Sequence, residues 1–210
     1  ADEAMLAVSS PEEKTLLRVG FAEYLAPQHL HTLLARFRRA HPNCDLSLVL
    51  GMGGEMLASL ERGDLDIVFA GPEADFGELL WEEPLVWTGA SNMANDPDAP
   101  IDLVLMHAPC SYRQIAFDAL NKLGKPWKLS IEANSVQAVQ SAIQAGLGVS
   151  VLPLSVVEDG VALNKDALPE LPDTSVMSYV KSDRSHPYAQ RFVDFLLSSF
   201  EKSPRLELVS

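Results

Sequence analysis

The architecture of the chain follows from residues 16–72, which contain LLRVGFAEYLAP (16–27), HLHTLLARFRRAHPNCDLSLVL (29–50) and LASLERGDLDIVFAGP (57–72). Apolar runs of strand length alternate there with segments of helical periodicity. Because a strand buried on both faces is continuously apolar, this alternation is typical of a parallel sheet covered by helices. The segment therefore predicts an α/β lobe in the order strand, helix, strand, helix, strand.

The elements of this first lobe are delimited by their periodicity. We expect helices at 27–40 and 55–61 and strands at 16–21, 45–50 and 64–71. The first helix has a single apolar stripe with the spacing i, i+3, i+4, i+7, formed by Leu30, Leu33, Leu34 and Phe37. GMGGEM (51–56) lacks the spacing of a phosphate-binding loop and indicates a turn.

A second set of elements repeats the pattern after an irregular stretch at 72–87 and a polar loop at 91–100. The expected strands are 101–106, 127–132 and 149–153, and the expected helices are 111–123 and 135–145. A strand at 176–181 and a final helix inside Pro187 complete the chain. The last helix carries an aromatic stripe expected to be core, formed by Tyr188, Phe192, Phe195, Leu196 and Phe200.

Composition restricts the class of protein. The 210 residues are 47% hydrophobic and carry a net charge of -13, so they can form a core but should repel a nucleic-acid backbone. No apolar stretch reaches the roughly 20 residues that span a bilayer. The two cysteines, Cys44 and Cys110, are too few for a disulfide-rich secreted fold. We therefore expect a cytoplasmic protein with no membrane partner.

The order of these motifs resembles the effector-binding domain of LysR-type transcriptional regulators. The likeness runs through the three segments quoted above, ANSVQAVQSAIQAGLGVSVLPLSVV (133–157) and RFVDFLLSSF (191–200), and covers roughly residues 16–200. Two further segments, WEEPLVWTGA (81–90) and APCSYRQIAFDALNKLGKPWKL (108–129), look like the branch of enterobacterial motility and virulence repressors.

This resemblance implies a periplasmic-binding-protein type II-like fold, with two Rossmann-like lobes, a hinge and an interlobe cleft. Residues 1–15 would be the end of a linker helix, 16–87 the first part of lobe I, 88–181 lobe II with the crossover strands, and 182–210 the return to lobe I. It also implies that DNA is contacted only by an N-terminal winged helix-turn-helix outside this segment, in a protein that regulates transcription.

The effector is expected at the carboxyl ends of the strands, where loops lead into helix N-termini with free amides. The turns at 22–27, 110–113 and 134–135 meet this condition. We predict that a small polar or anionic metabolite binds there, without a cofactor or metal ion. The candidate contacts are Ala22, Glu23, Tyr24, Gly71, Ser111, Tyr112, Arg113, Asn134 and Ser135.

Several of these residues have simpler interpretations that remain open. Ser111 and Ser135 are both suited to cap a helix. Arg113 is either an anion ligand or an exposed surface residue, and Tyr24 either contacts the ligand or packs between the lobes. Glu23 would disfavour a carboxylate effector if it faced the cleft, or it could pair with Arg113.

Three other functions compete with metabolite sensing. A redox sensor would use Cys110, whose pKa a helix start and Arg113 should lower, although a buried inert cysteine is the alternative. A solute-binding protein for transport would share the two-lobe architecture. An enzyme is not expected, because the five histidines are scattered and no catalytic motif occurs.

The resemblance further implies self-association into a homodimer or homotetramer. Family domains pair side by side, through the first-lobe helix of one subunit and the second-lobe helix of the other. In this chain those segments are 27–40 and 111–145. The residues His31, Ala35 and Arg38 fit either such an interface or a solvated helix face.

Overall fold

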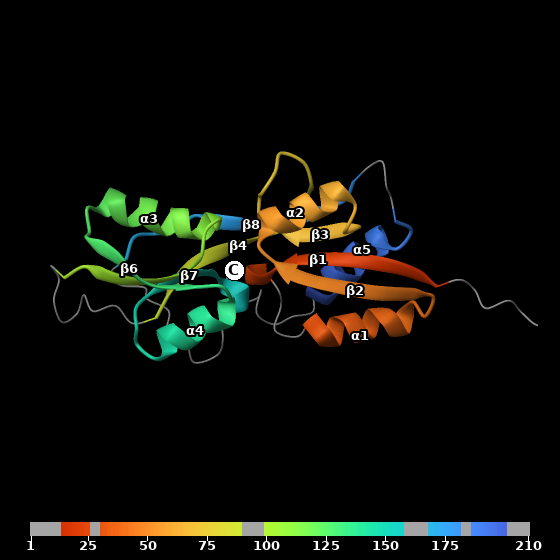
Figure 1. Cartoon of the computed structure of the whole chain (residues 1–210), viewed down its shortest axis with the longest axis horizontal. Coiled ribbons are helices and arrows are strands. Elements are labelled where there is room, and N and C mark those ends of the chain that lie inside the picture. The colour runs from red at the N-terminus through yellow and green to blue at the C-terminus, as the bar shows by residue number, and fades with distance from the viewer. Residues whose placement is uncertain (1–13, 26–29, 90–98, 158–167, 182–185, 201–210) are drawn as a thin grey trace, which may run out of the picture.

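The structure is a computed structural model, and it describes residues 14–25, 30–89, 99–157, 168–181 and 186–200. Two α/β lobes lie side by side along the long axis of the molecule (Figure 1). Two strands, β4 (Glu78–Thr88) and β8 (Asp173–Tyr179), run between the lobes. The described residues thus form the two-lobed fold that the sequence predicted.

Lobe I is built on a parallel three-stranded unit in which β1 lies between β2 and β3. The near-continuous burial of β1 and β3 explains why both read as apolar runs in the sequence. A short 3-10 helix, η1 (Glu23–Leu25), follows β1 directly. The strands of this lobe are β1 (Thr15–Ala22), β2 (Cys44–Gly51) and β3 (Ile67–Ala70), and its α-helices are α1 (Leu30–Ala40), α2 (Gly53–Arg62) and α5 (Ala189–Phe200).

Lobe II has the same alternation of strands and helices. Its strands β5 and β6 are parallel, and a parallel bridge between Leu103 and Val149 brings the residue before β7 beside β5. A 3-10 helix, η3 (Leu154–Val156), follows β7. The remaining elements are β5 (Ile101–Met106), α3 (Ser111–Leu123), β6 (Trp127–Ala133), α4 (Val136–Gln144) and β7 (Ser150–Pro153).

The crossover strands connect the two lobes through one sheet. β8 pairs antiparallel with β3 of lobe I and with β4, and β4 pairs antiparallel with β7 of lobe II. The prediction of an irregular stretch at 72–87 was wrong, because most of it is β4. Its first residues are exposed or half-buried, so this part of the strand lacks the apolar run by which buried strands are recognised.

The core of lobe I confirms the aromatic stripe of the last helix as packing. Phe192 and Leu196 are fully buried, and the ring of Phe192 meets that of Phe37 edge to face, with centroids 4.8 Å apart. The stripe on α1 packs into the same cluster. The side chain of Phe200 lies outside the described residues.

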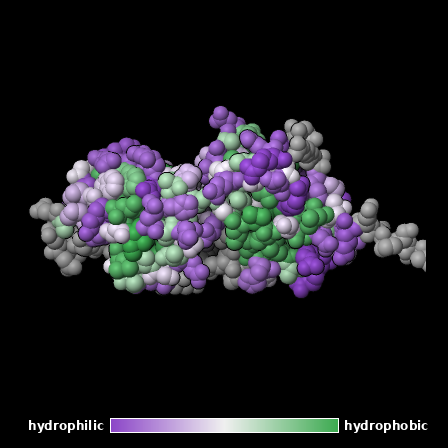
Figure 2. Space-filling model, in the orientation of Figure 1, coloured by the Kyte–Doolittle hydropathy of each residue, from purple (hydrophilic) through white to green (hydrophobic). Residues whose placement is uncertain are grey.

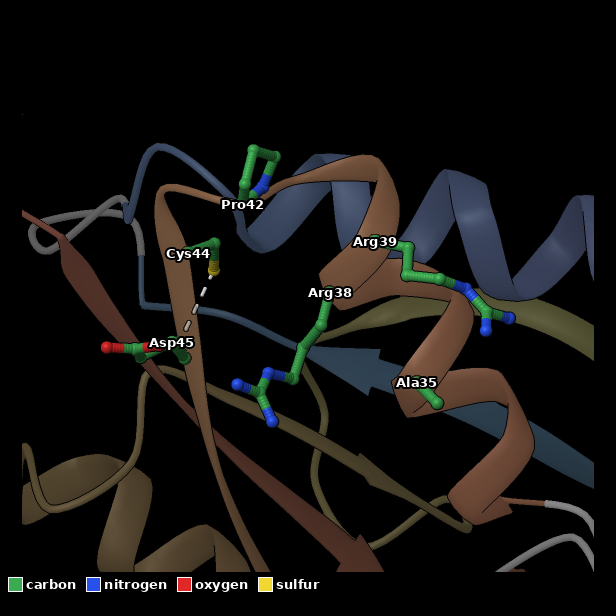
Figure 3. A pocket seen from close by; sticks show the side chains of 6 residues that line it. All are labelled: Ala35, Arg38, Arg39, Pro42, Cys44 and Asp45. Carbon is green, nitrogen blue, oxygen red and sulfur yellow. Dashed lines mark hydrogen bonds between the residues drawn. The ribbon is translucent and has the colours of Figure 1, made fainter.

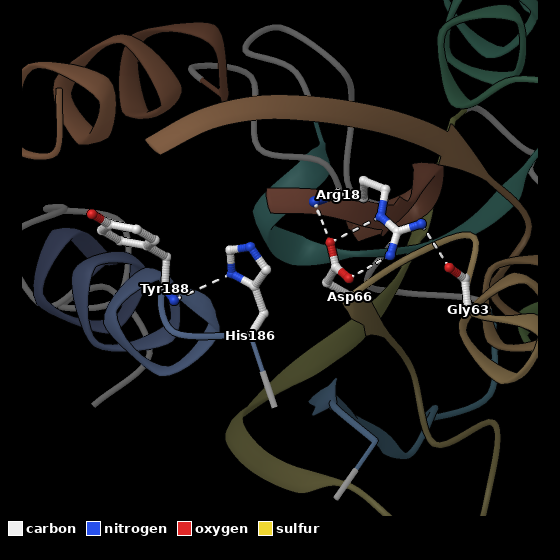
Figure 4. Close-up of polar contacts among 5 residues, drawn as sticks. All are labelled: Arg18, Gly63, Asp66, His186 and Tyr188. Atoms are coloured by element: carbon white, nitrogen blue, oxygen red, sulfur yellow. Dashed lines mark hydrogen bonds and ion pairs between the residues drawn. The ribbon is translucent and has the colours of Figure 1, made fainter. Parts of the chain in front are cut away.

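A partly buried ion pair connects β1 to the turn before β3 (Figure 4). Arg18 of β1 binds Asp66 through Nη2 and Oδ1, 2.7 Å apart, and donates to the carbonyl of Gly63 at 2.6 Å. Burial alone would raise the pKa of Asp66, but the hydrogen bonds from Arg18 hold that pKa below its ordinary value. The pair therefore ties the turn between α2 and β3 to β1.

No helix in the described part of the chain has the length and apolar character needed to cross a membrane.

Candidate functional site

The candidate site is the interlobe seam, which we define as the surface where η1 and Gly71 to Glu73 of lobe I meet the N-terminal ends of α3 and α4 of lobe II. Tyr24 is its central residue from lobe I, and it is 1% exposed. Its hydroxyl donates to Glu73 Oε1 at 2.5 Å and accepts from the amide of Gly71 at 3.3 Å. Burial, reinforced by the charge of Glu73, raises the pKa of Tyr24.

A close approach of backbone and side chain makes this arrangement possible. Gly53 is the first residue of α2, and a Cβ there would lie 2.7 Å from the Tyr24 hydroxyl oxygen. Only glycine leaves this space free. The glycines that indicated a turn in the sequence therefore begin a helix and admit the Tyr24 and Glu73 side chains beside its N-terminus.

Tyr112 of α3 meets Tyr24 from the other lobe. The two rings are arranged edge to face, with centroids 4.8 Å apart. The hydroxyl of Tyr112 lies 3.2 Å from Thr174 Oγ1 on the crossover strand β8, and burial raises the pKa of this tyrosine. Two residues predicted from separate loops are thus brought together at the seam.

Glu23 reaches directly from lobe I to lobe II. Its Oε1 accepts a hydrogen bond of 3.2 Å from the backbone amide of Val136, the first residue of α4. Ser135 caps the same helix, with Oγ accepting from the amide of Ala138 at 3.1 Å. The capping interpretation of Ser135 is therefore confirmed, and the pairing of Glu23 with Arg113 is not found.

Arg113 is engaged within lobe II. Its Nη1 pairs with the carboxylate of Glu132 on β6 and donates to the carbonyl of Met106 at 3.3 Å. The guanidinium also lies 5.4 Å from the ring centre of Phe117. These contacts leave Arg113 bound to its own lobe. Its partner Glu132 lies on another element, so local spacing could not identify it.

The remaining candidates differ in exposure. Ser111 is exposed and is the first residue of α3, whereas Cys110 is the residue at the cap position and makes no side-chain cap. The interpretation of Ser111 as a helix cap, one of the two left open by the sequence, is therefore not supported. Asn134 is exposed at the rim of the seam, and Ala22 is fully buried at the end of β1.

Both cysteines are free thiols. Burial raises the pKa of Cys110, and the nearby charge of Glu73 acts in the same direction. The amides of Arg113 and Tyr112 and the charge of Arg113 oppose this shift without reversing it. The expected lowering of the Cys110 pKa was therefore wrong, because desolvation outweighs the helix start.

Glu83 is a buried carboxylate that sequence reasoning missed. It is 4% exposed on β4, and it accepts from the amide of Ser155 at 2.9 Å and from the hydroxyl of Ser155 at 3.0 Å. The register places Glu83 opposite Thr174, the partner of Tyr112. The pairing of two distant strands brings Glu83 close to the seam, and no local pattern in the sequence indicates this position.

Two pockets that the structure describes lie away from the seam. One, of about 400 Å³, is lined on lobe I by Ala35, Arg38, Arg39, Pro42, Cys44 and Asp45 (Figure 3). The other lies on lobe II between α3 and residues 169–172. Neither is lined by a predicted effector contact. The seam itself is occupied by Glu23, Tyr24 and Tyr112, so a ligand would have to displace side chains there.

Comparison with known proteins identifies relatives along most of the chain. The family model described as "LysR substrate binding domain" matches residues 10–201. The HTH-type transcriptional regulator PecT of Dickeya dadantii is 28% identical over 82% of this chain and 56% of PecT. The uncharacterized HTH-type transcriptional regulator YusT of Bacillus subtilis is 31% identical over 87% of this chain and 63% of YusT.

Solved structures agree on the fold. The CcmR regulatory domain of Synechocystis PCC6803, described in complex with 2-PG, superimposes with a TM-score of 0.70 and 13% identity. The match covers 89% of this chain and 98% of that domain. Since the present chain spans only 56% and 63% of the two regulators named above, it corresponds to one part of each.

Proposed function

The chain belongs to the LysR substrate binding domain family, and on this premise we propose that it is the effector-sensing and oligomerisation domain of a LysR-type transcriptional regulator. Its effector would be a small polar or anionic metabolite bound at the interlobe seam. Contact with DNA would be made by a winged helix-turn-helix of the whole protein, which would act in the cytoplasm.

The observation that carries this proposal is the convergence of polar groups from both lobes on the seam. Glu23, Tyr24 and Glu73 come from lobe I, while Tyr112 and the amide of Val136 come from lobe II. Amides at a helix start and buried hydroxyls are groups that fix a small polar ligand. The structural relative described in complex with 2-PG supports a metabolite of similar size.

A thermal stability screen tests this function. The purified domain is mixed with a library of organic acids, phosphorylated acids and neutral polar metabolites, and its melting temperature is followed. A ligand at 100 times its Kd adds about 2.7 kcal/mol to the free energy of unfolding, which raises the melting temperature by roughly 5 to 10 °C. No stabilisation by any compound would contradict the proposal.

A pair of exposed substitutions locates the binding site of any compound that stabilises the domain. Asn134→Ala alters the rim of the seam, and Lys122→Ala alters the lobe II pocket. Both side chains are exposed, so both variants should fold normally. We expect Asn134→Ala to weaken the thermal shift and Lys122→Ala to leave it unchanged.

We also propose that the domain self-associates through α1 and the neighbouring edge of the lobe I sheet. Figure 2 shows hydrophobic surface over this part of lobe I, where Leu16, Val49 and Leu50 are between 41% and 50% exposed. His31, Ala35 and Arg38 are exposed on α1. Sedimentation should show a dimer or tetramer that Arg38→Glu dissociates, and a monomeric wild-type domain would contradict this.

The branch of motility and virulence repressors remains our proposal for the whole protein. The segments at 81–90 and 108–129 support it. Deletion of the gene should change swimming motility, and unchanged motility would contradict the assignment to this branch.

A further inference from the structure

Glu23 lies at a mechanical junction between the lobes. Its neighbour Tyr24 is fastened to lobe I by the hydrogen bonds with Glu73 and Gly71. The Glu23 carboxylate nevertheless binds the Val136 amide of lobe II. Figure 1 shows η1, in red, where the two lobes meet. One short turn is therefore bonded to both lobes through adjacent side chains.

The hydrogen bond of 3.2 Å between Glu23 and Val136 joins a side-chain carboxylate to the N-terminal end of α4. The first amides of a helix have no acceptor within the helix, and a carboxylate there interacts favourably with the helix dipole. Hydrogen bonds to an ionised acceptor are stronger than neutral ones. Among the described residues Glu23 has no ion-pair partner. Arg113, which could have paired with it, is paired with Glu132 instead. The amide of Val136 is thus its principal polar contact.

We propose that Glu23 is an interlobe latch that holds the lobes together over the seam when no effector is bound. The Glu23 carboxylate accepts the hydrogen bond from the first amide of α4, and an effector bound at the seam could accept that bond instead. The same turn, η1, also carries Tyr24, whose ring packs against that of Tyr112 in lobe II. An effector that enters the seam has to break the latch, and this consequence rests on the proposed function.

Amide hydrogen exchange measured by NMR tests the latch on the full 210-residue chain without any ligand. The amide of Val136 reports on lobe II, and the buried amide of Gly71, which donates to Tyr24, reports on lobe I. In Glu23→Ala we expect exchange at both amides to become about tenfold faster, which corresponds to about 1.4 kcal/mol. Glu23→Gln keeps an oxygen acceptor without the charge and should give a smaller increase at both.

Ser135→Ala is the matched control. It also removes an acceptor at the start of α4, but the bond that it breaks, from the Ala138 amide to Ser135 Oγ, lies within lobe II. It should speed exchange at Ala138 and leave Gly71 unchanged. Unchanged exchange of the β1 amides in every variant shows that lobe I remains folded.

A faster rate at Val136 alone in Glu23→Ala would overturn the proposal, because Glu23 would then be only a helix cap. Unchanged exchange at both amides would overturn it as well. Since no metabolite is added, the outcome is independent of the thermal screen. A failed screen would remove the sensing function and leave the latch standing.

Discussion

The ring of Tyr24 in lobe I contacts the ring of Tyr112 in lobe II edge to face, with centroids 4.8 Å apart. Each hydroxyl points to a different partner, Tyr24 to Glu73 and Tyr112 to Thr174. Edge-to-face aromatic pairs contribute about 0.5 to 1.5 kcal/mol beyond the burial of their area. The two lobes are therefore joined by the packing of two aromatic rings, and the hydroxyl of each tyrosine is hydrogen-bonded.

The Tyr24 hydroxyl should contribute more to stability than the Tyr112 hydroxyl. Tyr24→Phe removes a donor to the Glu73 carboxylate and an acceptor for the Gly71 amide, whereas Tyr112→Phe removes one bond to Thr174. We expect losses in the free energy of unfolding of about 2 to 3 kcal/mol and about 1 kcal/mol respectively. Urea unfolding measures both, and a larger loss in Tyr112→Phe would contradict this order.

The two serines that looked equivalent in the sequence should differ in stability. Ser135→Ala removes a helix cap and is expected to cost about 1 kcal/mol. Ser111→Ala alters an exposed residue inside the first turn of α3 and should change the free energy of unfolding by less than about 0.5 kcal/mol. Equal effects in urea unfolding would refute the assignment of Cys110 as the cap position.

Asp66 should make the domain sensitive to acid. Its pKa is lowered in the folded state by Arg18, so its carboxylate stabilises the fold above the unfolded pKa of about 3.9 and this contribution is lost as pH falls through the folded pKa. Unfolding measured from pH 6 to pH 3 should show a smaller pH dependence in Asp66→Asn. Asp64→Asn, in an exposed pair with Arg62, is the control and should resemble wild type.

Cys110 should react slowly with oxidants, because burial raises its pKa and the thiolate is the reactive form. After brief exposure to a stoichiometric amount of peroxide, intact-mass analysis of Cys44→Ala should show an unmodified Cys110. A sulfenic acid formed within minutes would contradict this expectation and revive the redox function.

Much of the fold could be predicted because buried strands and helices show characteristic patterns of apolar residues in the sequence. β1 and β3 are buried and were recognisable as apolar runs, and α1 showed the stripe that packs on lobe I. β4 was not recognisable, because its first residues are exposed or half-buried and do not form an apolar run. Its pairing with β8 depends on strands nearly a hundred residues apart.

The meeting of the predicted turns at one surface could be expected from the sequence, but their hydrogen-bond partners could not. The turns carrying Tyr24, Tyr112 and Ser135 meet at the seam, as expected for loops that lead from strands into helices. The partners of Glu23 and Arg113 are set by tertiary contacts between separate elements, Val136 and Glu132 respectively. Local spacing carries no information on such contacts.

Amide chemical-shift mapping is the most direct test of whether a small metabolite binds at the interlobe seam. The ¹⁵N-labelled domain is titrated with the compound that gives the largest thermal shift. We expect the largest shift changes at the amides of Glu23, Tyr24, Tyr112 and Val136. Changes confined to the lobe I pocket around Arg38 and Arg39, with the seam amides unmoved, would contradict the account.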